Sequence, residues 1–291
     1  MMAVTCNNGE EVMAIKDLLI AYDGSDAAKS AAHMAVKMAE KYDAALTGAY
    51  VYWPQQYGSD VKRWISQDVL ATMRDAERQA ADELGQSFRE LVAAIGPSRP
   101  VSWIVEPGQA GPMLARIGRF HDILMVGQFV GALRRERGAL DPEDLVQRAG
   151  RPIIIVPENH DTQPFKEHAA VAWDGSKAAA RALSDAMQIL ETKNKLDILT
   201  VETGRTRDHY APMPERDIVA HLKRHGVEAQ VVKLDASSGH VGDAILDHCK
   251  ATGPDVLVMG AYGRAKFGSL IFGGVTTHIL ENMNVPVLMS H

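Results

Sequence analysis

The sequence is poor in cysteine and contains no long apolar run. Its two cysteines, Cys6 and Cys249, stand almost a full chain apart, so a disulfide framework is not expected and a reducing compartment fits. Apolar stretches such as "PIIIVP" at 152–157 are far shorter than the roughly 20 residues that span a bilayer. The first residues, "MMAVTCNNGEEV", have neither the basic flank nor the apolar core of a signal peptide. We therefore expect a cytoplasmic protein without a membrane partner.

The sequence also lacks an excess of positive charge. Residues 1–150 contain 16 Lys and Arg against 20 Asp and Glu, and residues 151–291 contain 15 against 17, which gives the net charge of −6. Binding to a nucleic-acid backbone requires a basic surface, so neither half is expected to bind nucleic acid. With 46% apolar and 23% charged residues, the composition is that of a folded globular protein.

The chain repeats itself. Three segments of the first half recur in the second half in the same order, which indicates duplication. The pairs are "LLIAYDGSDAAKSA" (18–31) with "AAVAWDGSKAAARA" (169–182), "GQAGPMLARIGRFHDILMVG" (108–127) with "GHVGDAILDHCKATGPDVLVMG" (239–260), and "RPIIIVP" (151–157) with "VPVLMSH" (285–291).

A chain of 291 residues exceeds the usual size of one domain. We predict one domain at 1–157 and a second at 168–291. The polar, proline-containing segment "PENHDTQPFKE" at 157–167 links them.

Short apolar runs alternate with helix-length segments in each half, which is typical of β-α-β units on a parallel sheet. Strands as apolar as "DILMVG" and "DVLVMG" suit a sheet that is covered on both faces. The predicted fold class is α/β, with two tandem doubly wound five-stranded parallel-sheet domains, and a longer helix is expected around 64–95. In the second half we predict strands near 169–173, 196–201, 228–234, 255–259 and 286–290, and helices near 176–191, 214–226, 240–251 and 274–283.

Ligands of such sheets bind beyond the carboxyl ends of the strands. One of the segments at this edge in the second half, "GAYGRAKFGSLIFGGVTT" at 260–277, sets glycines around Arg264 and Lys266 and then enters a helix. Glycine permits close backbone approach, and a helix start has unpaired N–H groups and a favourable dipole, so the loop suits phosphate. Its spacing matches neither the P-loop nor the G-x-G-x-x-G motif. The simpler alternative is that these glycines serve a sharp turn and tight helix packing.

The spacing G-x2-G-x9-G, in a domain whose first strand ends in aspartate, resembles the universal stress protein family. The resemblance covers nearly the whole chain as two tandem copies. It implies a Rossmann-like, adenine-nucleotide α-hydrolase-like fold in each half, with the last strands pairing the halves as an intramolecular pseudo-dimer. It also implies a role in stress adaptation and ATP, with or without Mg²⁺, as the ligand.

The resemblance also implies which residues hold the nucleotide. Asp174 and the main chain of Val201 belong at the adenosine end. The phosphate end comprises Gly260, Gly263, Arg264, Gly273, Gly274, Val275 and Thr276.

Gly274 departs from the family pattern, which has Ser or Thr at this position. Thr276 keeps a hydroxyl two places further on. Losing one hydroxyl hydrogen bond to a charged phosphate should cost about 1.5–3 kcal/mol, while the glycine amides remain. Binding is therefore expected to be weakened rather than abolished.

The first half has lost this loop. Gly127 is kept, but Val130 and Leu140 replace the second and third glycines, and Asp141-Pro142-Glu143 stands at the expected helix start. Proline donates no N–H, and each carboxylate about 4 Å from a phosphate charge would cost on the order of 4 kcal/mol at an effective dielectric of about 20. We predict at most one ATP per chain.

Other polar residues have ordinary structural explanations. Asp23 reads as a turn or cap residue. His221 and His225 are spaced to chelate a metal, but no third ligand is evident and a surface role is preferred. His240 could approach the nucleotide, although helix capping or exposure is the preferred interpretation. Cys249 reads as a buried small residue rather than a nucleophile.

No residue set resembles a nucleophile, base and orienting partner, so we expect no catalytic residues and at most slow ATP hydrolysis. The competing hypothesis is a nucleotide-independent interaction scaffold with a vestigial glycine loop. An ATP-dependent transferase would need a second-substrate pocket that the sequence does not indicate. A homodimer is left open, and the sequence identifies no protein partner.

Overall fold

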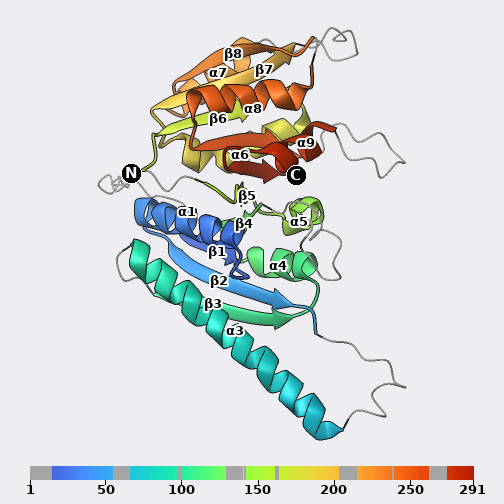
Figure 1. Ribbon diagram of the computed structural model, residues 1–291. Helices are drawn as coiled ribbons and strands as arrows, with labels where there is room; N and C mark the ends of the chain where they lie inside the picture. The colour runs from blue at the N-terminus through green and yellow to red at the C-terminus, as the bar shows by residue number, and fades with distance from the viewer. Residues whose placement is uncertain are drawn as a thin grey trace, which may run out of the picture.

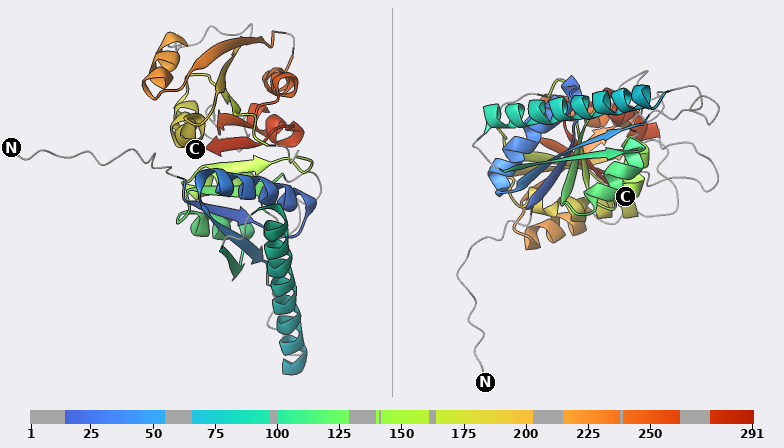
Figure 2. Two further views of the ribbon diagram at one scale, coloured as in Figure 1. Left: turned by 90° about the vertical axis from the view of Figure 1, so that its left-hand side faces the viewer. Right: turned by 90° about the horizontal axis from the view of Figure 1, so that it is seen from below.

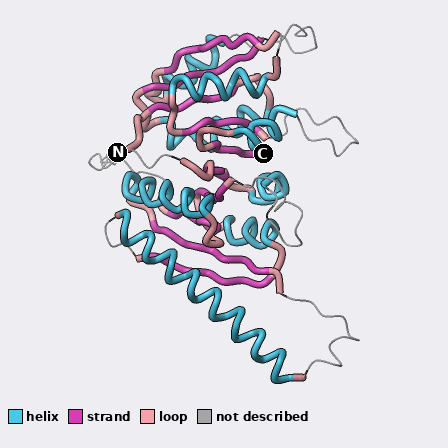
Figure 3. The backbone as a smooth tube through the Cα atoms, in the orientation of Figure 1, coloured by secondary structure: helices cyan, strands magenta, loops and turns pink. Residues whose placement is uncertain are grey.

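The computed structural model describes residues 15–54, 66–96, 100–128, 140, 142–160, 164–202, 215–237, 239–261 and 274–291. Within them, strands and helices alternate through both halves (Figures 1 and 3). The first half contains β1 (Asp17–Ala21), α1 (Asp26–Tyr42), β2 (Ala45–Tyr52), α3 (Gln67–Ile95), β3 (Val101–Pro107), α4 (Ala110–Gly118), β4 (Ile123–Gly127), α5 (Pro142–Ala149) and β5 (Ile153–Val156). The second half contains β6 (His168–Ala172), α6 (Lys177–Leu190), β7 (Lys195–Glu202), α7 (Glu215–Arg224), β8 (Ala229–Asp235), α8 (Val241–Thr252), β9 (Val256–Gly260), α9 (Gly274–Asn282) and β10 (Val287–Ser290).

The two halves join in one ten-stranded sheet of order β3-β2-β1-β4-β5-β10-β9-β6-β7-β8. Pairing is parallel within each half, and the halves meet where β5 pairs antiparallel with β10, with Ile154 opposite Leu288. This confirms the predicted fold class and the pseudo-dimer through the last strands. Every predicted strand and helix of the second half lies within two residues of its observed bounds.

Helices cover both faces of the sheet (Figure 2). Strand residues alternate between the faces: Leu18 and Ile20 belong to the apolar cluster that contains residues of α1, α3, α6 and α7, whereas Leu19 belongs to the cluster that contains residues of α4, α5, α8 and α9. Each of the two apolar clusters contains residues from both halves. The core is therefore continuous across the junction of the repeats.

The Asp-Gly-Ser repeat forms the same local structure in both halves. Ser25 and Ser176 are the N-caps of α1 and α6, and their Oγ atoms accept hydrogen bonds from the N–H groups three residues on, at 3.2 and 3.1 Å. The preceding glycines, Gly24 and Gly175, have φ of 81° and 71°. This left-handed conformation strains other residues, so the turn explains the glycine at both positions.

The longest helix, α3, is only partly packed. Its buried residues, Ala81, Gly85, Phe88 and Val92, all lie in its second half. Val69 and Met73 near its start are exposed, and this end projects beyond the sheet (Figure 1). Among the described residues, no helix is both long and apolar enough to cross a membrane.

Candidate functional site

The carboxyl ends of β9, β6 and β7 meet at one edge of the second half. These strands are parallel neighbours in the order β9-β6-β7. The winding reverses here, because β6 leads through β7 to β8 on one side while β9 leads to β10 on the other. Doubly wound sheets bind ligands in the crevice at this reversal. The structure brings Asp174, just after β6, Val201, near the end of β7, and Gly260, at the end of β9, to this edge.

Asp174 takes part in the turn that precedes α6. Its Oδ1 accepts a hydrogen bond from the Ser176 N–H at 2.9 Å, and its side chain is exposed. Asp23 makes the same contact with the Ser25 N–H at 3.0 Å. The turn interpretation of Asp23 is thus confirmed. For Asp174 the turn contact and a ligand role are compatible, and the ligand role stays a prediction.

Gly260 is glycine for a packing reason. A Cβ at this position would stand 2.3 Å from the carbonyl carbon of Ala178 and 2.5 Å from the nitrogen of Ala179, in the first turn of α6. At Gly127, the counterpart that ends β4, a Cβ would stand 2.5 Å from the carbonyl carbon of Ala27. Because the first half lacks the glycine loop, packing alone accounts for glycine at both positions. A contact of the Gly260 main chain with phosphate stays a prediction.

Of the loop that is predicted to bind phosphate, the structure describes the two ends, at Gly260 and at the start of α9. Gly274, Val275 and Thr276 are the first three residues of α9; Gly274 is exposed, Val275 is half-buried and Thr276 is 5% exposed. Gly263, Arg264 and Gly273 lie outside the described residues. A helix thus begins at Gly274, and the contact of its first N–H groups with phosphate stays a prediction.

The corresponding helix of the first half begins differently. Pro142 is the first residue of α5, and Leu140, in the position of the third glycine, is 5% exposed and packs in the apolar core. Proline at a first helical position is favourable for the helix but has no N–H for a ligand. Val130 and Asp141 lie outside the described residues.

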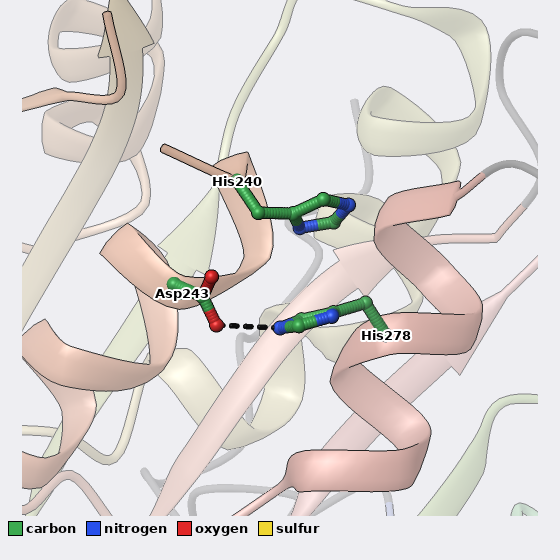
Figure 4. A group of neighbouring side chains, drawn as sticks. All are labelled: His240, Asp243 and His278. Carbon is green, nitrogen blue, oxygen red and sulfur yellow. Dashed lines mark hydrogen bonds and ion pairs between the residues drawn. The ribbon is translucent and has the colours of Figure 1, made fainter. Parts of the chain in front are cut away.

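Two helices bring His240, Asp243 and His278 together beside the start of α9 (Figure 4). His240 is the N-cap of α8, and its Nδ1 accepts a hydrogen bond from the Gly242 N–H at 3.0 Å, which confirms the capping interpretation. Its ring centroid lies 4.2 Å from that of His278, whose Nε2 donates to Asp243 Oδ1 at 2.6 Å. Sequence reasoning missed this group because no short spacing links residues of α8 to a residue of α9.

A buried carboxylate lies at the opposite edge of the second half. Asp197, near the amino end of β7, is fully buried. It accepts hydrogen bonds from Gln230 Nε2 at 2.6 Å, His168 Nε2 at 2.9 Å and His248 Nε2 at 3.1 Å. Burial by itself raises the pKa of Asp197, but the hydrogen bonds from Gln230, His248 and His168 outweigh it and hold the pKa below the ordinary 3.8. Asp197 lies near the amino end of β7, away from the carboxyl strand ends that form the candidate site. We therefore assign this network a role in stabilising the fold.

The remaining candidates behave as surface or core residues. His221 and His225 are exposed on α7, with ring centroids 4.9 Å apart, and His225 Nδ1 lies 3.5 Å from Glu191 Oε1. Cys249 is 2% exposed, and burial, aided by the charge of Asp197, raises the pKa of its thiol to about 12. The prediction that Cys249 is a buried small residue is confirmed.

Comparison with known proteins gives a consistent result. The model of the Universal stress protein family matches residues 14–127 and 167–291, one segment in each half. Universal stress protein Slr1230 from Synechocystis sp. is 23% identical over 293 residues, which cover 94% of this chain and 99% of that protein.

Two solved structures share the fold over almost the whole chain. The crystal structure of a universal stress protein from Archaeoglobus fulgidus DSM 4304 has a TM-score of 0.67 at 18% identity, covering 96% of this chain and 98% of that chain. The functionally unknown protein PA1789 from Pseudomonas aeruginosa PAO1 has a TM-score of 0.54 at 14% identity, covering 97% and 94%. In each case the shared fold therefore includes both repeats of this chain.

Proposed function

Because this chain belongs to the universal stress protein family, with one matched segment in each half, we propose that it binds ATP in its C-terminal half and acts as a nucleotide-dependent regulatory module in stress adaptation. Asp174 and the main chain of Val201 would hold the adenosine end. The phosphates, with or without Mg²⁺, would lie on the loop from Gly260 to Thr276. The distant cysteines support a cytoplasmic location for this activity.

The contrast between the two helix starts carries the proposal. In the second half, α9 begins with exposed Gly274 at the edge where the winding reverses. In the first half, α5 begins with Pro142 after the buried Leu140. A helix start that lacks an N–H and follows an apolar plug is a poor phosphate site, so we propose one ATP per chain.

The proposal includes at most slow ATP hydrolysis. In this proposal Asp174 would lie at the adenosine end, away from the γ-phosphate, and its Oδ1 accepts a hydrogen bond from the Ser176 N–H. A turnover assay should therefore show little phosphate release. Rapid, metal-dependent release that disappears in Asp174→Ala would show that the protein is an enzyme.

Isothermal titration calorimetry with ATP tests binding, and the duplicated turn supplies a matched control. Asp174→Ala and Asp23→Ala remove the same hydrogen bond to a serine N–H, at 2.9 and 3.0 Å. If Asp174 binds the nucleotide, Asp174→Ala weakens ATP binding and Asp23→Ala does not, although both variants lose a similar amount of stability. Gly263→Val should abolish binding. Two equivalent sites per chain would contradict the proposal.

The competing function is a nucleotide-independent interaction scaffold with a vestigial glycine loop. Gly274 favours it, because this residue lacks the hydroxyl of the family pattern. Absence of ATP binding by the intact protein would establish the scaffold instead. A homodimer would need a surface other than β5 and β10, since these strands already pair with each other inside the chain.

A further inference from the structure

We propose that His240, Asp243 and His278 form a binding site for a transition-metal dication, with Zn²⁺ as the ion that this ligand set fits best. One ligand atom of each residue lies within 4.8 Å of the other two. Across the described ranges of the chain, this is the group of His, Cys, Asp and Glu side chains that brings three ligands so close. The proposal does not depend on nucleotide binding.

The two helices that carry these ligands are fixed relative to each other. His240 and Asp243 lie at the N-cap and in the first turn of α8, and His278 lies in α9. The helices pack through one apolar cluster, and the Asn284 side chain after α9 donates to the Leu246 carbonyl of α8 at 3.2 Å. The backbone therefore sets the positions from which the three side chains approach one another, as Figure 4 shows.

The observed contacts are close to what an ion requires. Tetrahedral Zn²⁺, with bonds of about 2.0–2.1 Å, holds its ligand atoms about 3.3 Å apart, so ligand atoms that lie within 4.8 Å of one another must close by at most about 1.5 Å. Side-chain rotation can supply this, because His240 and Asp243 are exposed and the His278 side chain is 27% exposed. An ion can enter from solvent without movement of either helix.

Binding replaces a proton. The Nε2 proton of His278 now faces Asp243 Oδ1 at 2.6 Å, and the ion takes its place between these two atoms. In a neutral imidazole that proton moves to Nδ1, and in an imidazolium it is released to solvent. Metal affinity should therefore fall as the pH drops through the range in which histidine becomes protonated.

The first half shows that the fold does not need these ligands. In the repeat that pairs 108–127 with 239–260, Gly111 corresponds to Gly242, and the neighbouring residues of the two glycines correspond as well. The helix pairs α4 with α5 and α8 with α9 occupy the same face of the sheet. The positions equivalent to the three ligands are occupied by Gln109, Pro112 and Asp144, and Asp144 pairs with Arg148 of its own helix. The ligands are thus an addition of the second half and not a packing requirement of the repeat.

The ligand set selects the kind of ion. Imidazole nitrogens and a carboxylate suit Zn²⁺, Co²⁺ and Ni²⁺, whereas Mg²⁺ prefers oxygen ligands in octahedral geometry. The site is therefore distinct from any Mg²⁺ that accompanies ATP. It is nevertheless close to the start of α9, since His240 Nε2 lies 3.8 Å from where a Cβ of Gly274 would stand.

The test uses the full chain without a histidine tag, stripped of metal and titrated with Zn²⁺ by calorimetry and with Co²⁺ by visible absorption. We expect one ion per chain, no competition from Mg²⁺, and weaker binding at acid pH, where protons compete with the ion for the imidazole nitrogens. His240→Gln, Asp243→Asn and His278→Gln should each weaken binding roughly tenfold or more. The matched control, His221→Gln with His225→Gln, removes the other histidine pair and should leave affinity unchanged.

Three results would overturn the proposal: no binding at millimolar Zn²⁺, unchanged binding in the Asp243→Asn, His278→Gln double variant, or loss of binding in the His221, His225 control. If a variant fails to fold, nitrogen-resolved NMR of the histidine rings in the unsubstituted protein decides. Zn²⁺ should then change the nitrogen chemical shifts of the His240 and His278 rings and leave the chemical shifts of the His221 and His225 rings unchanged.

Discussion

At the scale of single residues, the most consequential side chain outside the candidate site is Asp197. It is fully buried, and three side chains from different elements donate to its carboxylate. Thr47, its counterpart in β2, is also buried but carries no charge. The stability of the second half therefore depends on a buried ionised carboxylate, and the first half has no charged group at the equivalent position.

Replacing Asp197 by Asn should destabilise the protein by about 3–5 kcal/mol near neutral pH, because it leaves donors facing an uncharged amide in a buried place. The pKa of Asp197 is lowered in the folded state, so its contribution is present above the ordinary 3.8 and is lost as the pH falls through the folded pKa. The difference in the free energy of unfolding between the wild type and Asp197→Asn should thus become smaller towards about pH 3. Urea unfolding at both pH values measures this. Asp235→Asn, at an exposed carboxylate that accepts from the Ser237 N–H at 2.8 Å, is the control and should change little.

Cys249 should be unreactive in the native protein. Burial raises the pKa of its thiol to about 12, so almost no thiolate exists at neutral pH. In a Cys6→Ser background, we expect a thiol reagent to label Cys249 slowly in buffer and rapidly in denaturant. Rapid native labelling would mean that this face of α8 opens readily.

At the scale of elements, the strand-end glycines couple β4 to α1 and β9 to α6. Gly127→Ala and Gly260→Ala should each destabilise the protein by about 1–3 kcal/mol, since the added Cβ would overlap helix backbone in both halves. Gly239→Ala is the control, because nothing lies within 4 Å of its Cβ position. Thermal unfolding separates them. A neutral Gly127→Ala would indicate that the helix starts can move away from the strands.

The sequence predicts the elements well because their causes are local. Apolar runs set β4 and β9, and serine caps set the starts of α1 and α6. The helix expected around 64–95 begins at Gln67, where Ser66 caps it. What the apolar period could not predict is that Val69 and Met73 stay uncovered, since that depends on how far the sheet extends beneath the helix.

The candidate site was only partly predictable, because some of its contacts join residues close in sequence and others join separate elements. The strand-end location and the Asp-Gly-Ser turn follow from contiguous residues, and so does the His240 cap. The convergence of Asp243 with His278 depends on α8 packing against α9, and the Asp197 network depends on side chains from three strands and a helix. No spacing along the chain encodes either contact.

At the scale of the whole molecule, the two halves are joined by more than the β5–β10 pairing. Tyr42 of α1 hydrogen-bonds Thr192 beyond α6 at 3.0 Å, and Lys41 pairs with Glu167. The Gln128 side chain, after β4, donates to the Leu280 carbonyl of α9 at 2.9 Å. With both apolar clusters running through the junction, neither half can unfold without exposing the core of the other.

We therefore expect one cooperative unfolding transition. Variants that keep Trp103 alone or Trp173 alone, with the other tryptophans changed to Phe, place one fluorescent probe in each half, and their denaturation curves should coincide. Ile154→Ala, at the β5–β10 junction, and Ile198→Ala, inside β7, both remove side chains that are 0% exposed and should cost about 2–5 kcal/mol each. In a single cooperative unit, either substitution shifts both probes equally. If the halves unfold separately, Ile198→Ala shifts only the Trp173 curve, because β9 and β6 separate β7 from β10 at the junction. The response of Trp103 to Ile198→Ala thus measures directly whether the antiparallel pairing makes two repeats into one folding unit.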